Sequence, residues 1–170
     1  MSRSVEENKE LAALLFPNIN KTVEDYQKIY PDRNLPDSAK VTRFAPSPTG
    51  FVHIGGLFSA LISERLAHQS EGIFYLRVED TDKKREIEKG IEGIVDALKN
   101  FNINNDEGYI SENDEIGPYK PYKQSDRMEI YHTFIKSLIE QDKAYACYAT
   151  TEELEQLRKN QEEQNITPGL

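Results

Sequence analysis

The chain has 170 residues, of which 30% are charged and 37% hydrophobic, and its formal net charge is −9. Seven Phe and nine Tyr among regularly spaced aliphatic residues exclude a wholly disordered chain. No apolar run reaches the roughly 18 residues of a membrane span, and the first ten residues contain no apolar secretory core. The one cysteine, Cys147, excludes an internal disulfide and a multi-cysteine zinc site. We therefore expect an acidic, globular, cytoplasmic protein without membrane association, whose charge argues against nucleic-acid binding except through a local basic patch.

The amino-terminal residues have the pattern of short helices. Three leucines within 11–15 form an apolar stripe, and Thr22 is placed to cap a second helical segment. The turn-rich stretch 32–38 follows and is the predicted domain boundary. The sequence thus predicts a helical appendage over 1–38 and a second domain over 39–170.

Strand and helix patterns alternate after this boundary. Short β-rich runs alternate with runs of helical periodicity, in the order strand 41–45, helix 57–66, strand 73–78 and helix 87–101. Strand, helix, strand and helix with short links predict an α/β fold with a parallel sheet, flanking helices and right-handed crossovers.

The second half of the chain gives weaker patterns. Residues 102–123 are rich in Asn, Asp, Gly and Pro, which predicts a loop. Ser125 is placed to cap a further helix, and residues 144–149 have the composition of a strand. Thr150 and Glu153 have the spacing of a capping box at the start of a polar helix.

The sharpest feature is the passage from the first strand to the first helix, whose sequence is RFAPSPTGFVHIGG over residues 43–56. It matches neither a Walker loop nor a G-x-G-x-x-G turn. Ligands of open α/β sheets nevertheless bind beyond the carboxyl ends of strands, where helix N-termini present free N–H groups to phosphate. Gly55 and Gly56 would let a base or phosphate approach the backbone, and a ring N–H of His53 can donate to a phosphate oxygen. The alternative is a turn shaped by Pro and Gly in which His53 is incidental.

Four blocks in order resemble one known family. They are RFAPSPTG with HIG at 43–55, RVEDTD with Arg85 at 77–85, the DEG, GPY and QSDR segments within 106–127, and AYAC with TEEL within 144–154. Together they resemble class I aminoacyl-tRNA synthetases of the bacterial glutamyl type over about 41–158. The first two blocks are similar to the glutamyl form rather than the glutaminyl form.

This resemblance implies a Rossmann-like, incomplete nucleotide-binding fold and a glutamate–tRNA ligase reaction. L-glutamate would be activated with ATP, accompanied by Mg²⁺, and then passed to the 3′-terminal ribose of tRNA(Glu). The resemblance assigns ATP binding and catalysis to His53, with ATP also contacting Gly55 and Gly56. It further assigns glutamate binding to Arg43, Ala45, Ser47 and Glu79, and contact with the tRNA acceptor end to Asp82 and Arg85.

The chain departs from the family pattern in several places. A Lys-Met-Ser-Lys-Ser-like second signature is absent, so we expect an amino-terminal piece of a synthetase that is inactive alone. Tyr148 and Ala149 follow Cys147 where a second thiol would be needed, so zinc is not expected. Phe58 stands where the family often has Arg, and the forty-residue appendage is unusual.

Other interpretations stay open at this point. The chain could be a non-catalytic module that binds ATP or glutamate, or a tRNA-modifying glutamyl paralogue, although the lone Cys147 argues against the paralogue. Arg43 could be a surface charge and Ser47 a turn residue. Segment 79–85 could be a solvated charge run in which Asp82 caps a helix. Charging of tRNA(Gln) and the oligomeric state are left undetermined by the sequence.

Overall fold

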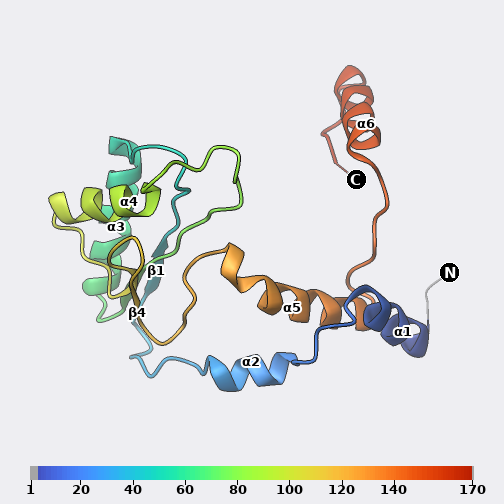
Figure 1. The fold of residues 1–170 in the computed structure, drawn as a ribbon, viewed down its shortest axis with the longest axis horizontal. Helices are drawn as coiled ribbons and strands as arrows, with labels where there is room; N and C mark the ends of the chain where they lie inside the picture. The colour runs from blue at the N-terminus through green and yellow to red at the C-terminus, as the bar shows by residue number, and fades with distance from the viewer. Residues whose placement is uncertain (1–3, 170) are drawn as a thin grey trace.

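A computed structural model of the protein describes residues 4–169. The outermost residues of both predicted domains, 1–3 and 170, lie outside this range. Figure 1 shows an α/β unit at one end of the molecule and a group of helices at the other. No helix within the described range is long and apolar enough to cross a membrane.

The α/β unit contains one four-stranded sheet with the strand order β1-β2-β3-β4. Strands β1 (Val41–Phe44), β2 (Ile73–Leu76) and β3 (Glu107–Tyr109) are parallel, as the pattern predicted. The short strand β4 (Glu115–Ile116) pairs antiparallel with β3. The predicted α/β, Rossmann-like sheet is therefore confirmed, with one antiparallel edge strand added. The prediction of a continuous loop over 102–123 was wrong, because β3 and β4 lie within it.

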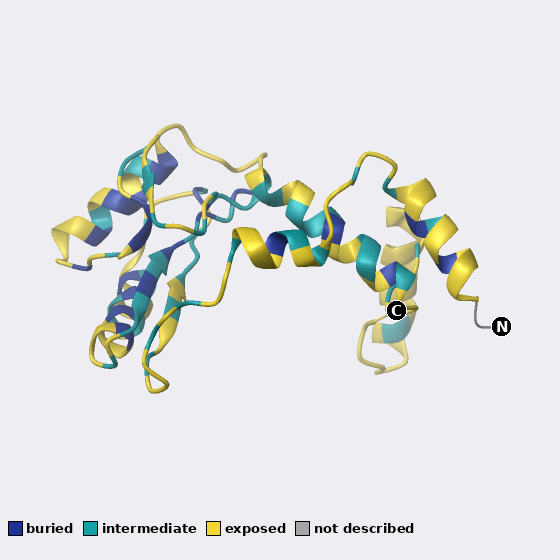
Figure 2. Ribbon diagram, turned by 90° about the horizontal axis from the view of Figure 1, so that it is seen from below, coloured by how far each residue is buried: buried dark blue, intermediate teal, exposed yellow. Residues whose placement is uncertain are grey.

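Helices α3 (Ile54–His68) and α4 (Gly90–Asn100) form the crossovers between the parallel strands. Alternate residues of a strand face opposite sides of its sheet. Phe74 and Leu76 face the helices and are fully buried against α4 residues such as Ile94. Figure 2 shows that most buried residues lie in this unit.

The other face of the sheet is only partly covered. It carries Val41, Arg43 and Tyr75, the first two exposed and the third half-buried. Val78 extends β2 by a single parallel bridge to Lys123. The sheet thus has one closed apolar face and one open face with polar side chains.

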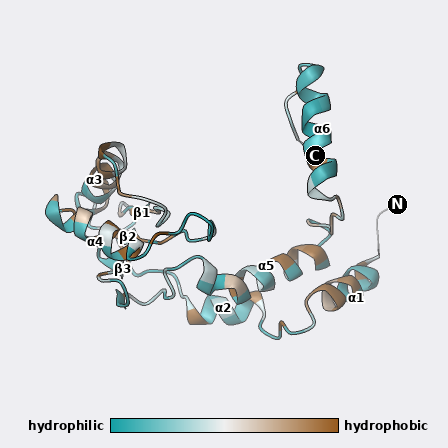
Figure 3. Cartoon of the chain, turned by 45° about the horizontal axis from the view of Figure 1, so that its top comes forward, coloured by the Kyte–Doolittle hydropathy of each residue, from teal (hydrophilic) through white to brown (hydrophobic). Residues whose placement is uncertain are grey.

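The remaining helices form the second part of the molecule. Helices α1 (Val5–Leu15) and α2 (Val23–Ile29) both pack on α5 (Met128–Glu140), which follows a short 3-10 turn, η1 (Ser125–Arg127). Helix α6 (Thr151–Glu163) is almost entirely hydrophilic in Figure 3 and stands apart from the other helices in Figures 1 and 3. The cap predicted at Thr22 and the capping box predicted at Thr150 with Glu153 are confirmed.

Three local predictions were wrong. Helix α4 begins at Gly90 rather than near Ile87, because Lys89 has a left-handed backbone (φ 56°) and the Ile87 N–H donates to the Pro48 carbonyl instead. Ser125 does not cap a helix with its side chain, since its hydroxyl donates to Asp80. Residues 144–149 form no strand in the structure.

Candidate functional site

The loop between β1 and α3, residues 45–53, is held in place by the segments that follow β2. The Glu79 N–H donates to the Pro46 carbonyl at 2.9 Å, and the Ile87 N–H donates to the Pro48 carbonyl at 3.0 Å. Pro48 is fully buried, and a Cβ at Gly90 would lie 2.8 Å from it. Because α4 starts with a glycine, this helix can press directly against the loop, whose conformation is therefore set by its neighbours.

His53 is the N-cap residue of α3. Its Nδ1 accepts hydrogen bonds from the backbone N–H groups of Gly55 at 3.1 Å and Gly56 at 3.3 Å. The proton of the neutral imidazole therefore lies on Nε2, which forms no hydrogen bond within residues 4–169 and can donate to a ligand. Helix N-termini generally present free N–H groups, but here the histidine itself accepts those of Gly55 and Gly56. A side chain at position 55 would also crowd the ring, since its Cβ would lie 3.0 Å from His53 Cε1.

A pocket of about 290 Å³ opens beside this cap. Among the predicted site residues, Ser47, His53 and Gly56 line it, together with loop residues and the ring of Phe44. Both polar and apolar groups line this pocket, as the site of a nucleotide requires. Ala45 lies half-buried at the start of the loop and Gly55 on the other side of the helix end, so neither lines this pocket.

Arg43 and Glu79 lie together on the open face of the sheet. Arg43 Nη1 is 3.7 Å from Glu79 Oε1, and Arg77 Nη2 donates to the same oxygen at 2.6 Å. The side chains of Arg43, Glu79 and Arg77 are 43%, 31% and 23% exposed, so all three face solvent in part. Among the described residues, no hydrogen bond occupies Glu79 Oε2. The three side chains together carry one net positive charge and one free carboxylate oxygen.

Asp80, next to Glu79, is buried and fully engaged. The Ser125 N–H donates to Oδ1 at 2.9 Å and the Ser125 hydroxyl to Oδ2 at 2.6 Å, while Lys83 and Lys123 form ion pairs with Oδ2. Burial alone would raise the pKa of Asp80, but the hydrogen bonds from Lys83 and Ser125 outweigh it and lower the pKa to about 2. Asp80 is therefore a charged anchor that holds the residues after β2 to η1.

Asp82 and Arg85 lie in an exposed turn beyond this anchor. Arg85 Nε donates to Asp82 Oδ2 at 2.6 Å, and the Arg85 N–H donates to the Asp82 carbonyl at 3.2 Å. No helix begins at Asp82, so the alternative in which it caps one was wrong. The pair follows Glu79 closely along the chain, but neither residue lines the pocket beside His53.

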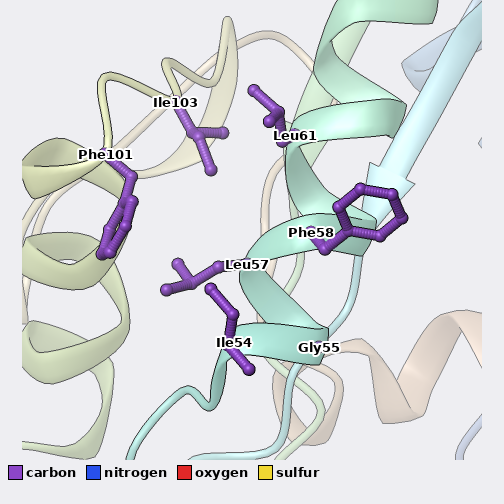
Figure 4. Close-up of a pocket in the computed structure, with 7 residues that line it drawn as sticks. All are labelled: Ile54, Gly55, Leu57, Phe58, Leu61, Phe101 and Ile103. Atoms are coloured by element: carbon purple, nitrogen blue, oxygen red, sulfur yellow. The ribbon is translucent and has the colours of Figure 1, made fainter.

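A larger hollow, about 380 Å³, lies between α3 and the end of α4. Figure 4 shows the residues that line it, which are apolar apart from Gly55. These side chains offer no hydrogen-bonding group that could orient a polar ligand. The smaller pocket beside His53 is therefore the better candidate for a site of chemistry, although it has less volume.

The described residues form no cluster suited to a resident metal. Within residues 4–169, no group of three or more His, Cys, Asp or Glu side chains is placed to hold a metal ion. Cys147 is exposed and unpaired.

Arg77 and Asp80 were not singled out from the sequence, although both lie within the RVEDTD block. The period of two along a strand places Arg77 on the same face as Glu79, and this signal was available. The same period continues the buried positions Phe74, Leu76 and Val78 to Asp80. A carboxylate at such a position needs buried partners, which the sequence alone did not identify.

Comparison with known proteins gives a consistent result. A model of the family described as "tRNA synthetases class I (E and Q), catalytic domain" matches residues 40–168. A glutamate–tRNA ligase of Clostridium perfringens strain 13 is 57% identical over 94% of this chain, and one of Acetivibrio thermocellus is 52% identical over 95%. The chain spans only 29% and 30% of the length of these two relatives.

Solved structures agree with this result. A glutamate tRNA ligase from Elizabethkingia meningosepticum, crystallised in complex with its amino acid, aligns with a TM-score of 0.64 and 39% identity. The alignment covers 77% of this chain and 25% of that one. A glutamate-tRNA synthetase from Elizabethkingia anophelis aligns with a TM-score of 0.65 and 38% identity over 76% of this chain and 25% of that one. Because the family model matches residues 40–168 and these relatives are 57% and 52% identical, this chain belongs to the catalytic-domain family of class I tRNA synthetases for glutamate and glutamine.

Proposed function

We propose that this chain forms the first part of the catalytic domain of a glutamate–tRNA ligase. The enzyme activates L-glutamate with ATP and transfers it to tRNA(Glu) in the cytoplasm. Residues 1–38 act as a helical appendage to the catalytic part, 39–170. The names of the relatives support the choice of amino acid.

One observation carries the proposal. Arg43 Nη1, near the end of β1, lies 3.7 Å from Oε1 of Glu79, which follows β2. The loop that links β1 to the His53 cap is hydrogen-bonded to the Glu79 backbone. Groups suited to an amino acid and groups suited to a nucleotide thus meet at one edge of the sheet, where open α/β sheets bind ligands.

The glutamate subsite follows from charge and geometry. Two guanidinium groups and one carboxylate give a net charge of +1, which complements the net −1 of glutamate. Arg43 forks onto the side-chain carboxylate of the substrate, while the free Oε2 of Glu79 accepts from its α-ammonium group. Ser47 adds a neutral hydrogen bond, and the backbone at Ala45 lies beside the amino acid.

ATP occupies the pocket beside His53 in this proposal. The Nε2–H of His53 donates to a phosphate oxygen, and Gly56, which lines this pocket, allows close approach of the nucleotide. Gly55 serves ATP binding from the other side of the helix end, where the absence of a side chain leaves room for the His53 ring. Mg²⁺ would accompany ATP and offset part of the negative charge on its phosphates.

The reaction is two displacements. An oxygen of the glutamate α-carboxylate bonds to the α-phosphorus of ATP, whose bond to the bridging oxygen breaks to release pyrophosphate. A hydroxyl of the 3′-terminal ribose of tRNA then attacks the carbonyl carbon, loses its proton, and AMP leaves. The protein contributes mainly by positioning the reactants and stabilising charge on the phosphate. The exposed pair Asp82 and Arg85 contacts the tRNA acceptor end.

Titration calorimetry with a non-hydrolysable glutamyl-adenylate analogue tests the proposal. The 170-residue chain should bind this analogue more tightly than the glutaminyl analogue, and His53→Ala should weaken binding about tenfold or more. The same substitution should lower stability by only about 1 kcal/mol, because it removes an exposed helix cap. His132→Ala, which removes a histidine outside the site that packs on Phe16, is the matched control.

Three outcomes would contradict the proposal. Absence of binding by the wild-type chain would exclude both the enzyme and the binding module. Equal affinity for both analogues would contradict the choice of glutamate. If the chain is joined to the sequence that completes the length of its relatives, glutamate-dependent exchange of pyrophosphate into ATP is expected. Binding without exchange in that longer protein would favour the non-catalytic module.

A further inference from the structure

Residues 117–127, which we call the flanking segment, lie directly against the stretch of chain that connects α2 to β1. Two tyrosines join them reciprocally. The Tyr30 hydroxyl donates to the Lys120 carbonyl at 2.6 Å, and the Tyr119 hydroxyl donates to the Pro31 carbonyl at 2.6 Å. The connection from the appendage to the sheet is therefore fixed at a defined place on the α/β unit.

Arg33 is the centre of this contact. Its guanidinium donates to both carboxylate oxygens of Glu107, with Nη2 2.8 Å from Oε2, and lies 3.9 Å from the centre of the Tyr119 ring. Glu107 is in β3 and only 5% exposed, and its hydrogen bond raises the pKa of Arg33. A buried carboxylate without such a partner would be strongly destabilised, so Glu107 depends on Arg33.

The Glu107 carboxylate also accepts a buried hydrogen bond from the flanking segment. The Tyr122 hydroxyl donates to Glu107 Oε2 at 2.7 Å, and Tyr122 is 3% exposed. The Tyr122 carbonyl accepts the N–H of Val78 at 2.9 Å, and the Gln124 N–H returns to the Val78 carbonyl at 2.9 Å. Arg33, Glu107 and Tyr122 thus form a short chain of hydrogen bonds that ends on the residue immediately before Glu79.

Beyond Val78, the flanking segment also holds the residue after Glu79. Ser125 donates two hydrogen bonds to the buried Asp80, as described above. Glu79 therefore lies between two backbone positions, Val78 and Asp80, that are both fixed to the flanking segment. The Glu79 N–H is held separately by the Pro46 carbonyl, so the flanking segment and the loop after β1 together set the place of its side chain beside Arg43.

We propose that Arg33 is a positioning residue for the glutamate subsite. By pairing with Glu107 it keeps Tyr122 against Val78, and so fixes the backbone from which Glu79 meets Arg43 and the substrate. The role of Glu79 toward glutamate rests on the proposed function, whereas the positioning of Val78 by Arg33 does not. The connection between the appendage and the sheet thereby helps to position the glutamate subsite.

Amide hydrogen exchange measured by NMR tests the positioning without any ligand. In Arg33→Ala we expect the Val78 and Gln124 amides to exchange about tenfold faster or more, which corresponds to about 1.4 kcal/mol. The Arg77 amide, which donates to the Phe44 carbonyl at 3.0 Å within the sheet, is the internal reference and should change little. Arg33→Lys keeps the charge but not the paired geometry, and should show an intermediate effect. It also keeps the test available if Arg33→Ala does not fold.

Lys21→Ala is the matched control, because it removes an exposed ion pair of the same appendage, with Glu129 at 3.1 Å. It should leave the Val78 amide unchanged. Equal acceleration at Val78, Gln124 and Arg77 in the Arg33 variants would show general destabilisation and overturn the proposal. Unchanged exchange at Val78 would overturn it as well.

The ligand arm uses calorimetry with the glutamyl-adenylate analogue. Arg33→Ala should weaken binding about threefold to tenfold, Arg33→Lys less, and Lys21→Ala not at all. Unchanged affinity despite faster exchange at Val78 would contradict the positioning role. If the wild-type chain binds no analogue, the proposed function fails, and the exchange experiment still decides whether Arg33 holds Val78 in place.

Discussion

The two faces of the sheet are built from the same strands and yet follow opposite rules. On the closed face, Phe74 and Leu76 are fully buried beneath α3 and α4. On the open face, Arg43, Tyr75 and Arg77 stay partly exposed, and their contacts are ion pairs and ring packing. Every second residue of β2 therefore serves stability, and the residues between them are available for binding.

Glu79 and Asp80 show this division at the seam between the faces. They are adjacent carboxylates, but Asp80 has each oxygen engaged in the interior, whereas Glu79 keeps one oxygen free among the described residues. A carboxylate with all its lone pairs engaged can only hold structure, and one with a free lone pair can also hold a ligand. The comparison predicts that changes on the closed face lower stability, and that changes on the open face lower affinity.

The largest effect is expected at Phe74. Phe74→Ala removes a fully buried ring and should lower the free energy of unfolding by about 3–5 kcal/mol, measured by urea denaturation. Tyr75→Ala is the matched control, because it removes a ring of similar size from the next residue on the open face. If Tyr75→Ala lowers the free energy of unfolding as much as Phe74→Ala does, the two faces of the sheet do not differ in their contribution to stability. If Phe74→Ala does not fold, Phe74→Leu gives the same test with a smaller loss.

A smaller effect is expected from the titration of Asp80. Its pKa is lowered to about 2 in the folded protein, from 3.8, so the folded state resists protonation between these values. The stabilisation is fully present above about pH 4 and is lost as the pH falls through 2, a loss of about 2 kcal/mol. Urea denaturation at several pH values should show Asp80→Asn less stable than wild type at pH 7 and less sensitive to acid below pH 4. Asp82→Asn, in the exposed turn, should leave the acid dependence of wild type unchanged, and an equal change in both variants would contradict the role of Asp80.

The parts of the fold that the sequence predicted are those with a long, regular apolar pattern. The apolar stripe of Ile94, Val95 and Leu98 predicted α4, and the β-rich runs predicted β1 and β2. Strands β3 and β4 have three and two residues, too few for any alternation to be visible. Ile87 continued the helical spacing by coincidence, because its backbone pairs with the loop instead. Residues 144–149 had strand composition but no neighbouring strand to pair with.

The candidate site was predictable where its chemistry is local and not where it depends on distant partners. His53 was identified from its position before Gly55 and Gly56, although its cap had to be seen in the structure. Arg43 is in register with Tyr75 rather than with Glu79. The strand period nevertheless places Arg43 and Glu79 on the same face, near the carboxyl ends of two parallel neighbours, and this much could be predicted. The link between Arg33 and Glu107 joins residues 74 positions apart and has no sequence signature.

The smallest effect on stability, and the largest on affinity, is expected at Arg43. Its side chain is 43% exposed and its ion pair with Glu79 spans 3.7 Å, so Arg43→Gln should cost less than about 1 kcal/mol of stability. The same change should weaken binding of the glutamyl-adenylate analogue about tenfold to a hundredfold, because a charge-assisted hydrogen bond to the substrate carboxylate is lost. Arg43→Lys should fall between, since an ammonium group cannot form the paired contact. Lys21→Gln, which alters an exposed ion pair outside the site, should change neither quantity. If Arg43→Gln lowers stability as Phe74→Ala does and leaves affinity intact, Arg43 is a structural charge, and the open face does not hold the substrate.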